Sequence, residues 1–176
     1  MPDRRGDPVG RGRRPLDHHG LAQGDHLGGE SGRTLVALIR PFSSVDEAAV
    51  SALWAQAFPG DPARNEPRGF IARKRTRDSD LFWVAEADGE VVGAVVAGYD
   101  GVRGWLYHLA VAPGLQGRGI GRALAEHAVA ALRELGCMKV NLQVRRGNDA
   151  VRGFYESLGW VEDPAISMGR VLSDSP

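Results

Sequence analysis

Apolar residues recur along residues 34–173 with two spacings, and these predict the order of the secondary structure. Compact apolar runs bounded by Gly, Pro or Asp are typical of strands, and apolar residues three or four positions apart are typical of one helix face. The predicted strands cover residues 35–39, 81–87, 90–99, 105–111, 139–144, 160–161 and 166–172. The predicted helices begin at Ser44 and end before Pro59, then cover residues 65–77, 119–135 and 148–158. This order describes an α/β fold with a mixed sheet and helices on its faces.

Polar residues at the element ends support this layout. Ser44 precedes Glu47 by the three residues of a capping box. The dipeptide Asp88-Gly89 suits the positive backbone angles of a tight hairpin, so we expect the strands on either side of it to pair antiparallel. Gly136 is expected to end the longest helix in a left-handed conformation.

The segment 1–33 differs in composition from the rest of the chain. It is rich in Gly and Arg, lacks aromatic residues and has few apolar ones, so it cannot bury enough surface to offset its ordering entropy. We expect a disordered leader, the product of an upstream start codon, followed by a single domain over residues 34–173. Its nearly balanced charges give little support for a nucleic-acid-binding arm, and a flexible tail gives its histidines no fixed geometry for a metal.

Overall composition excludes several classes of protein. The 22 Lys and Arg balance the 22 Asp and Glu, so the chain lacks the excess basic charge of nucleic-acid coat proteins and membrane-surface binders. The single cysteine, Cys137, permits no internal disulfide. No apolar stretch approaches a membrane span, and no apolar run follows the Arg-rich start as in a secretory signal. We therefore expect a cytoplasmic protein with no metal, no nucleic-acid partner and no membrane partner.

The candidate chemistry lies at residues 116–122, between a predicted strand and the longest predicted helix. The first turn of a helix has unpaired backbone N–H groups and the positive end of the helix dipole, which together favour an anion. Gly117, Gly119 and Gly121 remove the Cβ atoms that would hold a phosphate away from those groups. Arg118 and Arg122 add positive charge at the same place. A tight turn alone would explain one of the glycines, not three.

Two common phosphate motifs do not fit this loop. No Gly-Lys pair occurs in the chain, which excludes the P-loop pattern. In the dinucleotide pattern G-x-G-x-x-G the third glycine would fall on Arg122 or Leu124. The loop is therefore a phosphate site of another kind.

Two separated motifs resemble the GNAT superfamily of N-acetyltransferases. Gln116-x-x-Gly119-x-Gly121 resembles its motif A, Q/R-x-x-G-x-G/A, and follows an apolar strand ending in Ala112-Pro113. Residues 148–160 are similar to the later pattern N-x-x-A-x-x-x-Y-x-x-x-G-F, with the Ala displaced and Trp in place of Phe. The resemblance covers about residues 35–172. It is closest to the YpeA-type acetyltransferases, on segments 82–86, 98–101 and 166–169, and motif A is also similar to that of ribosomal-protein amino-terminal acetyltransferases.

This resemblance implies a fold, a donor and a set of binding residues. The fold would be a mostly antiparallel sheet splayed between strands 4 and 5, with helices on both faces. Acetyl-CoA would be the co-substrate, and its acetyl group would pass directly to a primary amine in a ternary complex. The N–H of Val111 would polarise the thioester carbonyl. The implied acetyl-CoA-binding residues are Leu109, Ala110, Val111, Gln116, Gly117, Arg118, Gly119, Ile120, Gly121, Arg122 and Asn148.

The same resemblance makes Tyr155 the general acid that protonates the CoA thiolate. The alternative is that Tyr155 packs as an interfacial residue and that Asn148 only caps its helix. The fourth strand carries no carboxylate, which leaves His108 as a candidate base because it titrates in the useful range. Strand alternation places His108 on the side of Leu106 and Ala110, where it could equally be a packed histidine, and Glu86, Asp100 or a water chain could serve instead.

The acceptor is open at this stage. It is a small-molecule amine or a protein or peptide amine, and the chain is a monomer or a homodimer. The basic residues of the 65–77 helix are read as a solvated face, with attraction of an acidic substrate or phosphate as the minority interpretation. The alternatives to an active enzyme are a catalytically weak acetyl-CoA-binding regulatory module and a nucleotide-binding protein. Candidate wall residues of the acceptor pocket are Trp54, Phe58, Phe70, Tyr107, Ala165 and Met168.

Overall fold

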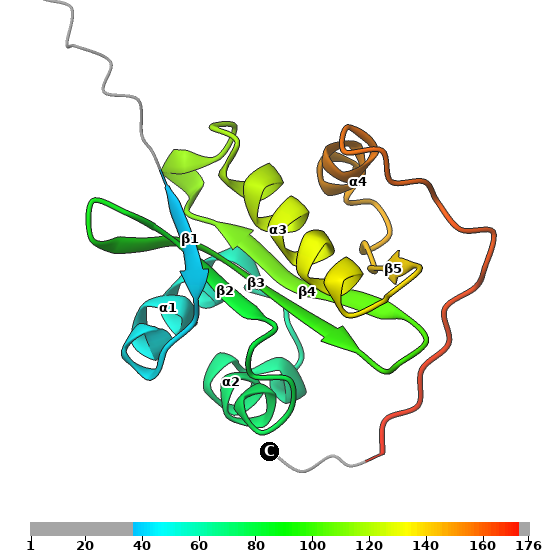
Figure 1. Cartoon of the computed structure of the whole chain (residues 1–176), viewed down its shortest axis with the longest axis horizontal. Helices are drawn as coiled ribbons and strands as arrows, with labels where there is room; N and C mark the ends of the chain where they lie inside the picture. Colours follow the sequence, from blue (N-terminus) through cyan, green and yellow to red (C-terminus); the bar gives the residue numbers. More distant parts are fainter. Residues whose placement is uncertain (1–36, 173–176) are drawn as a thin grey trace, which may run out of the picture. The chain divides into compact units, whose positions relative to one another are not determined.

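A computed structural model describes residues 37–172, and the predicted leader at 1–33 lies outside them. Five strands form one sheet in the order β1-β2-β3-β4-β5 (Figure 1). Neighbouring strands are antiparallel except β4 and β5, which are parallel. The sheet is therefore mixed, as the sequence predicted. The strands are β1 (Leu38–Pro41), β2 (Phe82–Ala87), β3 (Glu90–Tyr99), β4 (Gly104–Val111) and β5 (Val140–Asn141).

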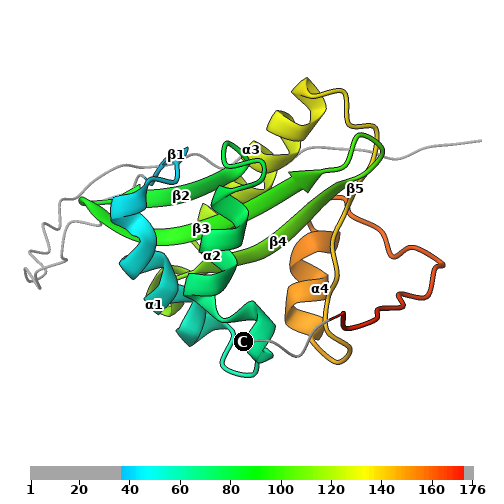
Figure 2. The same cartoon turned by 90° about the horizontal axis from the view of Figure 1, so that it is seen from below.

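Helices cover both faces of the sheet. Figure 2 shows α3 on one side and α1 and α2 on the other. Val50, Leu53 and Trp54 of α1 are buried with Ile71 of α2 against one face, whereas Leu124, Ala128 and Leu132 of α3 are buried in the core on the other face. Burial of this apolar stripe is the main force that fixes α3, and with it the loop before it, to the sheet. The helices are α1 (Glu47–Ala57), α2 (Pro67–Arg75), α3 (Ile120–Glu134) and α4 (Asp149–Glu156).

The first strand and helix differ in detail from the sequence prediction. β1 includes Arg40 and ends at Pro41, two residues beyond the predicted end at Ile39. The cap lies one residue earlier than predicted: the Ser43 amide donates to Asp46 Oδ2 at 2.8 Å, and a short 3-10 turn, Ser44–Asp46, precedes α1. The buried Asp46 also accepts two hydrogen bonds from Arg40, at 2.7 and 2.8 Å. This paired charge selects Asp46 over Glu47 as the capping residue.

A β-bulge in β4 changes which side chains share a face. Ala94 pairs with Ala110 but Val96 pairs with Tyr107, so two residues of β4 lie opposite one residue of β3. His108 occupies the bulge with a φ of 47°. The prediction that His108 shares a face with both Leu106 and Ala110 is therefore wrong for Leu106, which packs in the core beneath α3. The extra residue breaks the period-2 alternation from which that prediction was made.

The sheet is splayed beyond the start of β4, as predicted. β5 pairs with β4 only at Gly104↔Val140 and Trp105↔Asn141, so within residues 37–172 the second half of β4 has no strand neighbour on that side. The predicted strand at 139–144 is thus shortened to two residues. The predicted strands at 160–161 and 166–172 are wrong, because those residues adopt no regular secondary structure. A two-residue β5 offers no edge long enough to pair with them, and the apolar side chains of residues 161–172, such as Ile166, are exposed.

Candidate active site

Residues 116–119 form an open turn between β4 and α3. Gln116 fixes the turn to the strand, because its Nε2 donates to the Val111 carbonyl at 3.2 Å. Gly117 and Gly119 have φ values of 75° and 85°, in the left-handed region that L side chains rarely adopt. A Cβ atom built on either glycine would meet no atom within 4 Å. The two glycines therefore serve the backbone path and leave open space outside it, which a ligand can enter.

The backbone amides at this turn are available to an anion. From Gly117 onward, the first amide within the described chain that donates to a backbone carbonyl is that of Ala123, to Gly119 at 3.0 Å. The preceding amides lie at the positive end of the 15-residue helix α3. Gly117, Arg118 and Gly119 are exposed, whereas the Ile120 side chain is buried in the core and contributes only its backbone here. Such a turn fits a phosphate or pyrophosphate group.

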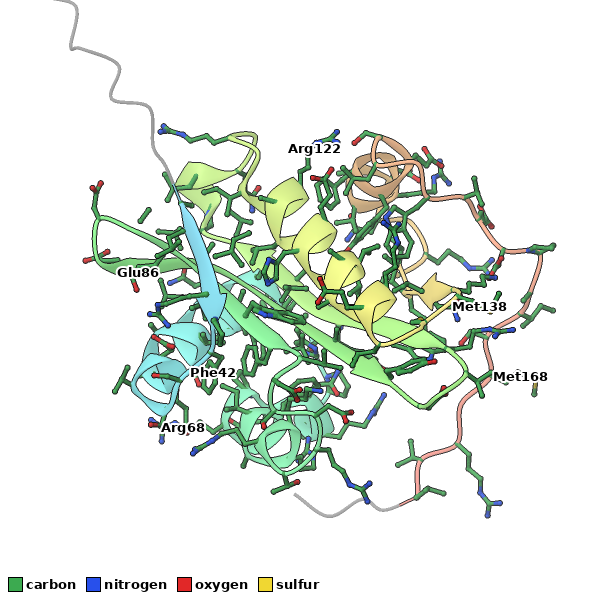
Figure 3. All side chains as sticks on the ribbon, in the orientation of Figure 1. Phe42, Arg68, Glu86, Arg122, Met138 and Met168 are labelled. Carbon is green, nitrogen blue, oxygen red and sulfur yellow. The ribbon has the colours of Figure 1, made fainter. Side chains whose placement is uncertain are left out.

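Gly121 and Arg122 join the turn to α4. A Cβ atom on Gly121 would lie 3.4 Å from the Phe154 ring and 3.6 Å from Val111 Cγ2, so this glycine permits close packing of α3, α4 and β4. Arg122 pairs with Glu126 at 3.2 Å and donates to the Ser157 carbonyl at 3.3 Å, and Figure 3 shows it near α4. Arg118 forms no ion pair within residues 37–172. Of the two predicted phosphate-binding arginines, Arg118 is the one without a structural partner.

Backbone groups at the end of β4 face the opening where the sheet splays. Ala112 N donates to Val92 O at 2.9 Å, toward β3. Because successive amides of a strand point to opposite sides, the Val111 N–H points toward the side where β4 has no neighbour. The side chains of Leu109 and Val111 pack in the core beneath α3, and that of Ala110 packs beneath α1 and α2. These residues can therefore contribute to binding through backbone groups.

His108 pairs with a carboxylate, an interaction that the sequence did not predict. Its Nε2 lies 3.2 Å from Oδ2 of Asp61, in the segment between α1 and α2, and the other oxygen of Asp61 accepts from Arg145. Burial lowers the pKa of His108 below 6.5, and Asp61 partly opposes this effect. The imidazole is therefore mainly neutral at pH 7, with one nitrogen able to accept a proton while Asp61 orients the ring.

Aromatic side chains surround this histidine. The ring of His108 lies 4.9 Å from that of Trp54, 5.2 Å from that of Phe58 and 4.3 Å from that of Phe70. These three predicted wall residues therefore gather at one place. Met168 does not join them, because its side chain is 92% exposed. Figure 3 shows it on the segment after α4, and Ala165 lies on the same exposed segment.

The other carboxylates considered as bases have structural partners. Glu86 Oε2 accepts from Arg40 at 2.7 Å on the first two strands. Asp100 Oδ1 accepts from the amides of Val102 and Arg103 in the β3–β4 turn, at 2.8 and 2.7 Å. Both carboxylates stabilise local structure, which leaves His108 as the residue whose environment fits a base.

Tyr155 and Asn148 lie on α4. The Tyr155 ring packs between Phe154 and Trp160, at 4.9 and 5.5 Å, and burial raises the pKa of its hydroxyl to about 12. Asn148 caps α4, because its Oδ1 accepts from the Val151 amide at 3.3 Å. The capping alternative thus holds for that oxygen, while the Asn148 amide nitrogen makes no hydrogen bond within the described chain.

The sequence did not predict that Asp61 would contact His108 or that Arg145 would pair with Asp61. Asp61 lies in a Gly-Asp-Pro turn, where an aspartate is expected for local reasons, and 47 positions separate it from His108. Arg145 pairs with Asp61. No sequence signal connects these three residues. Within the described residues, no group of three His, Cys, Asp or Glu side chains could hold a metal ion, and no helix could cross a membrane.

Comparisons with known proteins place the chain among acetyltransferases. The model of the Acetyltransferase (GNAT) family matches residues 47–160. An acetyltransferase of Pectobacterium atrosepticum is 45% identical over 134 residues, which cover 76% of this chain and 94% of that protein. The solved structure of Ard1 from Thermoplasma volcanium is 28% identical, covers 71% of this chain and 82% of its own, and has a TM-score of 0.64. An aminoglycoside N-acetyltransferase in complex with CoA shares the fold, with a TM-score of 0.65, 19% identity and coverage of 81% of this chain and 99% of its own.

Proposed function

Because the chain belongs to the GNAT acetyltransferase family, we propose that it transfers the acetyl group of acetyl-CoA directly to a primary amine in a ternary complex. One observation carries this proposal: a single stretch of chain holds a neutral imidazole at His108, an outward amide at Val111 and the open glycine turn from Gly117. A candidate base, a candidate oxyanion donor and a candidate phosphate site thus follow one another along one continuous segment of the chain. Residues 34–173 are proposed to form this catalytic domain.

The glycine turn is proposed to bind the donor. The amides from Gly117 to Gly121 would hold the pyrophosphate, with Arg118 adding charge and Gln116 and Arg122 holding the turn in place. The exposed edge of β4 at Leu109, Ala110 and Val111 would bind the pantetheine arm, with help from the Asn148 amide group. Acetyl-CoA supplies an activated thioester, and the Val111 N–H would stabilise negative charge on its carbonyl oxygen.

His108 is proposed to accept the proton of the attacking amine. An alkylammonium cannot act as a nucleophile, so a proton must leave before or during attack. The lowered pKa keeps His108 in the base form at neutral pH, and Asp61 stabilises the imidazolium once the proton arrives. Asp61 is a positioning residue in this scheme, and Arg145 holds its second oxygen.

Tyr155 is proposed to donate to the leaving thiolate. Its raised pKa keeps the hydroxyl protonated throughout the neutral range. The apolar surroundings that raise this pKa also disfavour a free thiolate beside it, so the pKa of the thiol rises in the same direction as that of Tyr155.

Gly119→Ala is expected to weaken acetyl-CoA binding at least tenfold. A φ of 85° costs an alanine about 1–2 kcal/mol, and the new methyl group enters the space proposed for the pyrophosphate. The matched control is Gly153→Ala, since Gly153 lies inside α4, has no positive φ, and its new methyl group would meet no atom within 4 Å. Isothermal titration of both variants with acetyl-CoA checks this prediction, and equal affinities for the two would contradict the proposed site.

Release of CoA thiol in the presence of amines tests the proposed function. The full chain is incubated with acetyl-CoA and peptide amino termini, lysine side chains, polyamines, aminoglycosides or free amino acids. Amine-dependent release is expected for at least one class. Thermal stabilisation by acetyl-CoA without release would favour the regulatory module, and stabilisation by ATP or NAD instead would favour a nucleotide-binding protein.

A further inference from the structure

The basic residues of the segment 65–77 do not all face solvent in the same way. Arg73 and Lys74 of α2, and Arg77 just past its end, line an open cavity of about 330 Å³, together with the rings of Phe70 and Tyr107. The volume is within the range of small-molecule sites. Part of this charge run, predicted from the sequence to be a solvated face, therefore surrounds a cavity.

The cavity has an excess of positive charge. Lys74 Nζ donates to the Ala97 carbonyl at 2.6 Å and lies 3.9 Å from Asp78, which is the acidic residue of the lining. Arg73 donates to the Arg64 carbonyl and forms no ion pair, and Arg77 forms none either, within residues 37–172. Two further carboxylates lie outside the lining. The charge of Asp80 acts to raise the pKa of Lys74, and that of Asp100 acts to raise the pKa of Tyr107. The charge of Arg73 also acts on Glu66, so within residues 37–172 the Arg77 guanidinium is the charge left for a ligand.

This cavity adjoins the proposed base. The Phe70 ring that lines it lies 4.3 Å from the His108 ring, between their centroids. The bulge brings Tyr107, which precedes His108, onto the same side. Arg73 follows Phe70 by three positions, which corresponds to roughly 5 Å along the axis of α2. Arg77 lies two positions past the end of that helix at Arg75 and lines the same cavity. An acceptor with its amine at His108 would thus reach this basic lining with a group beyond the Phe70 ring.

We infer, on the basis of the proposed amine acetyltransferase function, that the acceptor carries a carboxylate or phosphate in addition to its amine, bound by Arg77 with Arg73 beside it. Guanidinium groups pair with such oxyanions through bidentate hydrogen bonds. The rings of Phe70 and Tyr107 accept the apolar part of the molecule. A polycation such as an aminoglycoside or a polyamine is repelled by the same charges.

Matched acceptors test this inference directly. The amidated tripeptide alanyl-glutamyl-phenylalanine is compared with its glutaminyl counterpart, and glucosamine 6-phosphate with glucosamine, with kanamycin as the polycation. At least one anionic member is expected to have a kcat/KM about ten times that of its neutral partner, and the pair that shows this distinguishes a peptide from a small-molecule source. Equal values within both pairs, or preference for kanamycin, would overturn the inference.

Two variants of the same segment assign the preference to the cavity. Arg77→Gln is expected to raise KM for the preferred anionic acceptor about tenfold and to leave KM for its neutral partner and for acetyl-CoA unchanged. Arg75→Gln removes the same charge outside the cavity, where Arg75 lies 3.7 Å from Glu47, and is expected to change nothing. Equal effects of the two variants would overturn the inference. Release of CoA without any anionic preference would overturn it alone, whereas no release with any amine would overturn the proposed function and this inference with it.

Discussion

Tyr155→Phe is expected to lower kcat about a hundredfold and to leave the affinity for acetyl-CoA unchanged. The substitution removes one hydroxyl and preserves the ring that packs against Phe154 and Trp160. Folding and donor binding should therefore persist, while the leaving thiolate loses its hydrogen-bond donor. The quantities to measure are kcat from CoA release and Kd from titration with acetyl-CoA.

Tyr99→Phe is the matched control for this variant. The Tyr99 hydroxyl donates to the Gly101 carbonyl in the β3–β4 turn, so the same chemical change is made in a residue with a structural partner. Its kcat should equal that of the unaltered chain. A Tyr155→Phe protein with unaltered kcat would show that Tyr155 is only a packing residue.

His108→Gln is expected to lower kcat/KM at pH 7 by about a hundredfold and to remove one ionisation from the pH profile. A base acts in its neutral form, so activity falls as pH decreases through its pKa, and burial places this pKa below 6.5. The limb assigned to His108 therefore lies on the acidic side, separate from the ionisation of the acceptor amine, which every variant shares.

Asp61→Asn separates the positioning role from simple packing. The Asp61 charge raises the pKa of His108, so its removal lowers that pKa further and moves the acidic limb to lower pH. The rate should also fall, because the imidazolium formed during transfer loses its counter-charge. The control is His127→Gln, a histidine of α3 whose ring packs on Trp83 at 5.1 Å. An acidic limb that stays in place in both Asp61→Asn and His108→Gln would exclude His108 as the base.

Local patterns predicted the parts of the fold that local interactions determine. The strand at 90–99 has the predicted bounds, because Asp88-Gly89 fixes the turn and the apolar run continues to Tyr99. Gly136 ends α3 with a φ of 82°, as predicted from its position. The three glycines of the loop lie between β4 and the first turn of α3, where the sequence pattern put them. Their structural roles differ: Gly117 and Gly119 adopt a left-handed backbone conformation, whereas Gly121 permits close packing.

The features that the sequence did not predict depend on contacts between distant segments. The bulge at His108 comes from the register between β3 and β4, which a single strand's pattern does not encode. The contact of His108 with Asp61 needs the segment after α1 to fold over β4. The segment 160–172 has enough apolar residues for strands, but strand formation needs a partner edge and β5 pairs through only two residues.

The most direct test of the proposed function is the product balance of one reaction. The full chain is incubated with acetyl-CoA and the best acceptor of the panel, and free CoA and acetylated amine are both quantified by mass spectrometry. We expect one N-acetylated acceptor for each CoA released, and a rate that falls with Tyr155→Phe and with His108→Gln. Saturable binding of acetyl-CoA with no acetylated amine from any class of acceptor would contradict the proposed transferase and leave a binding module in its place.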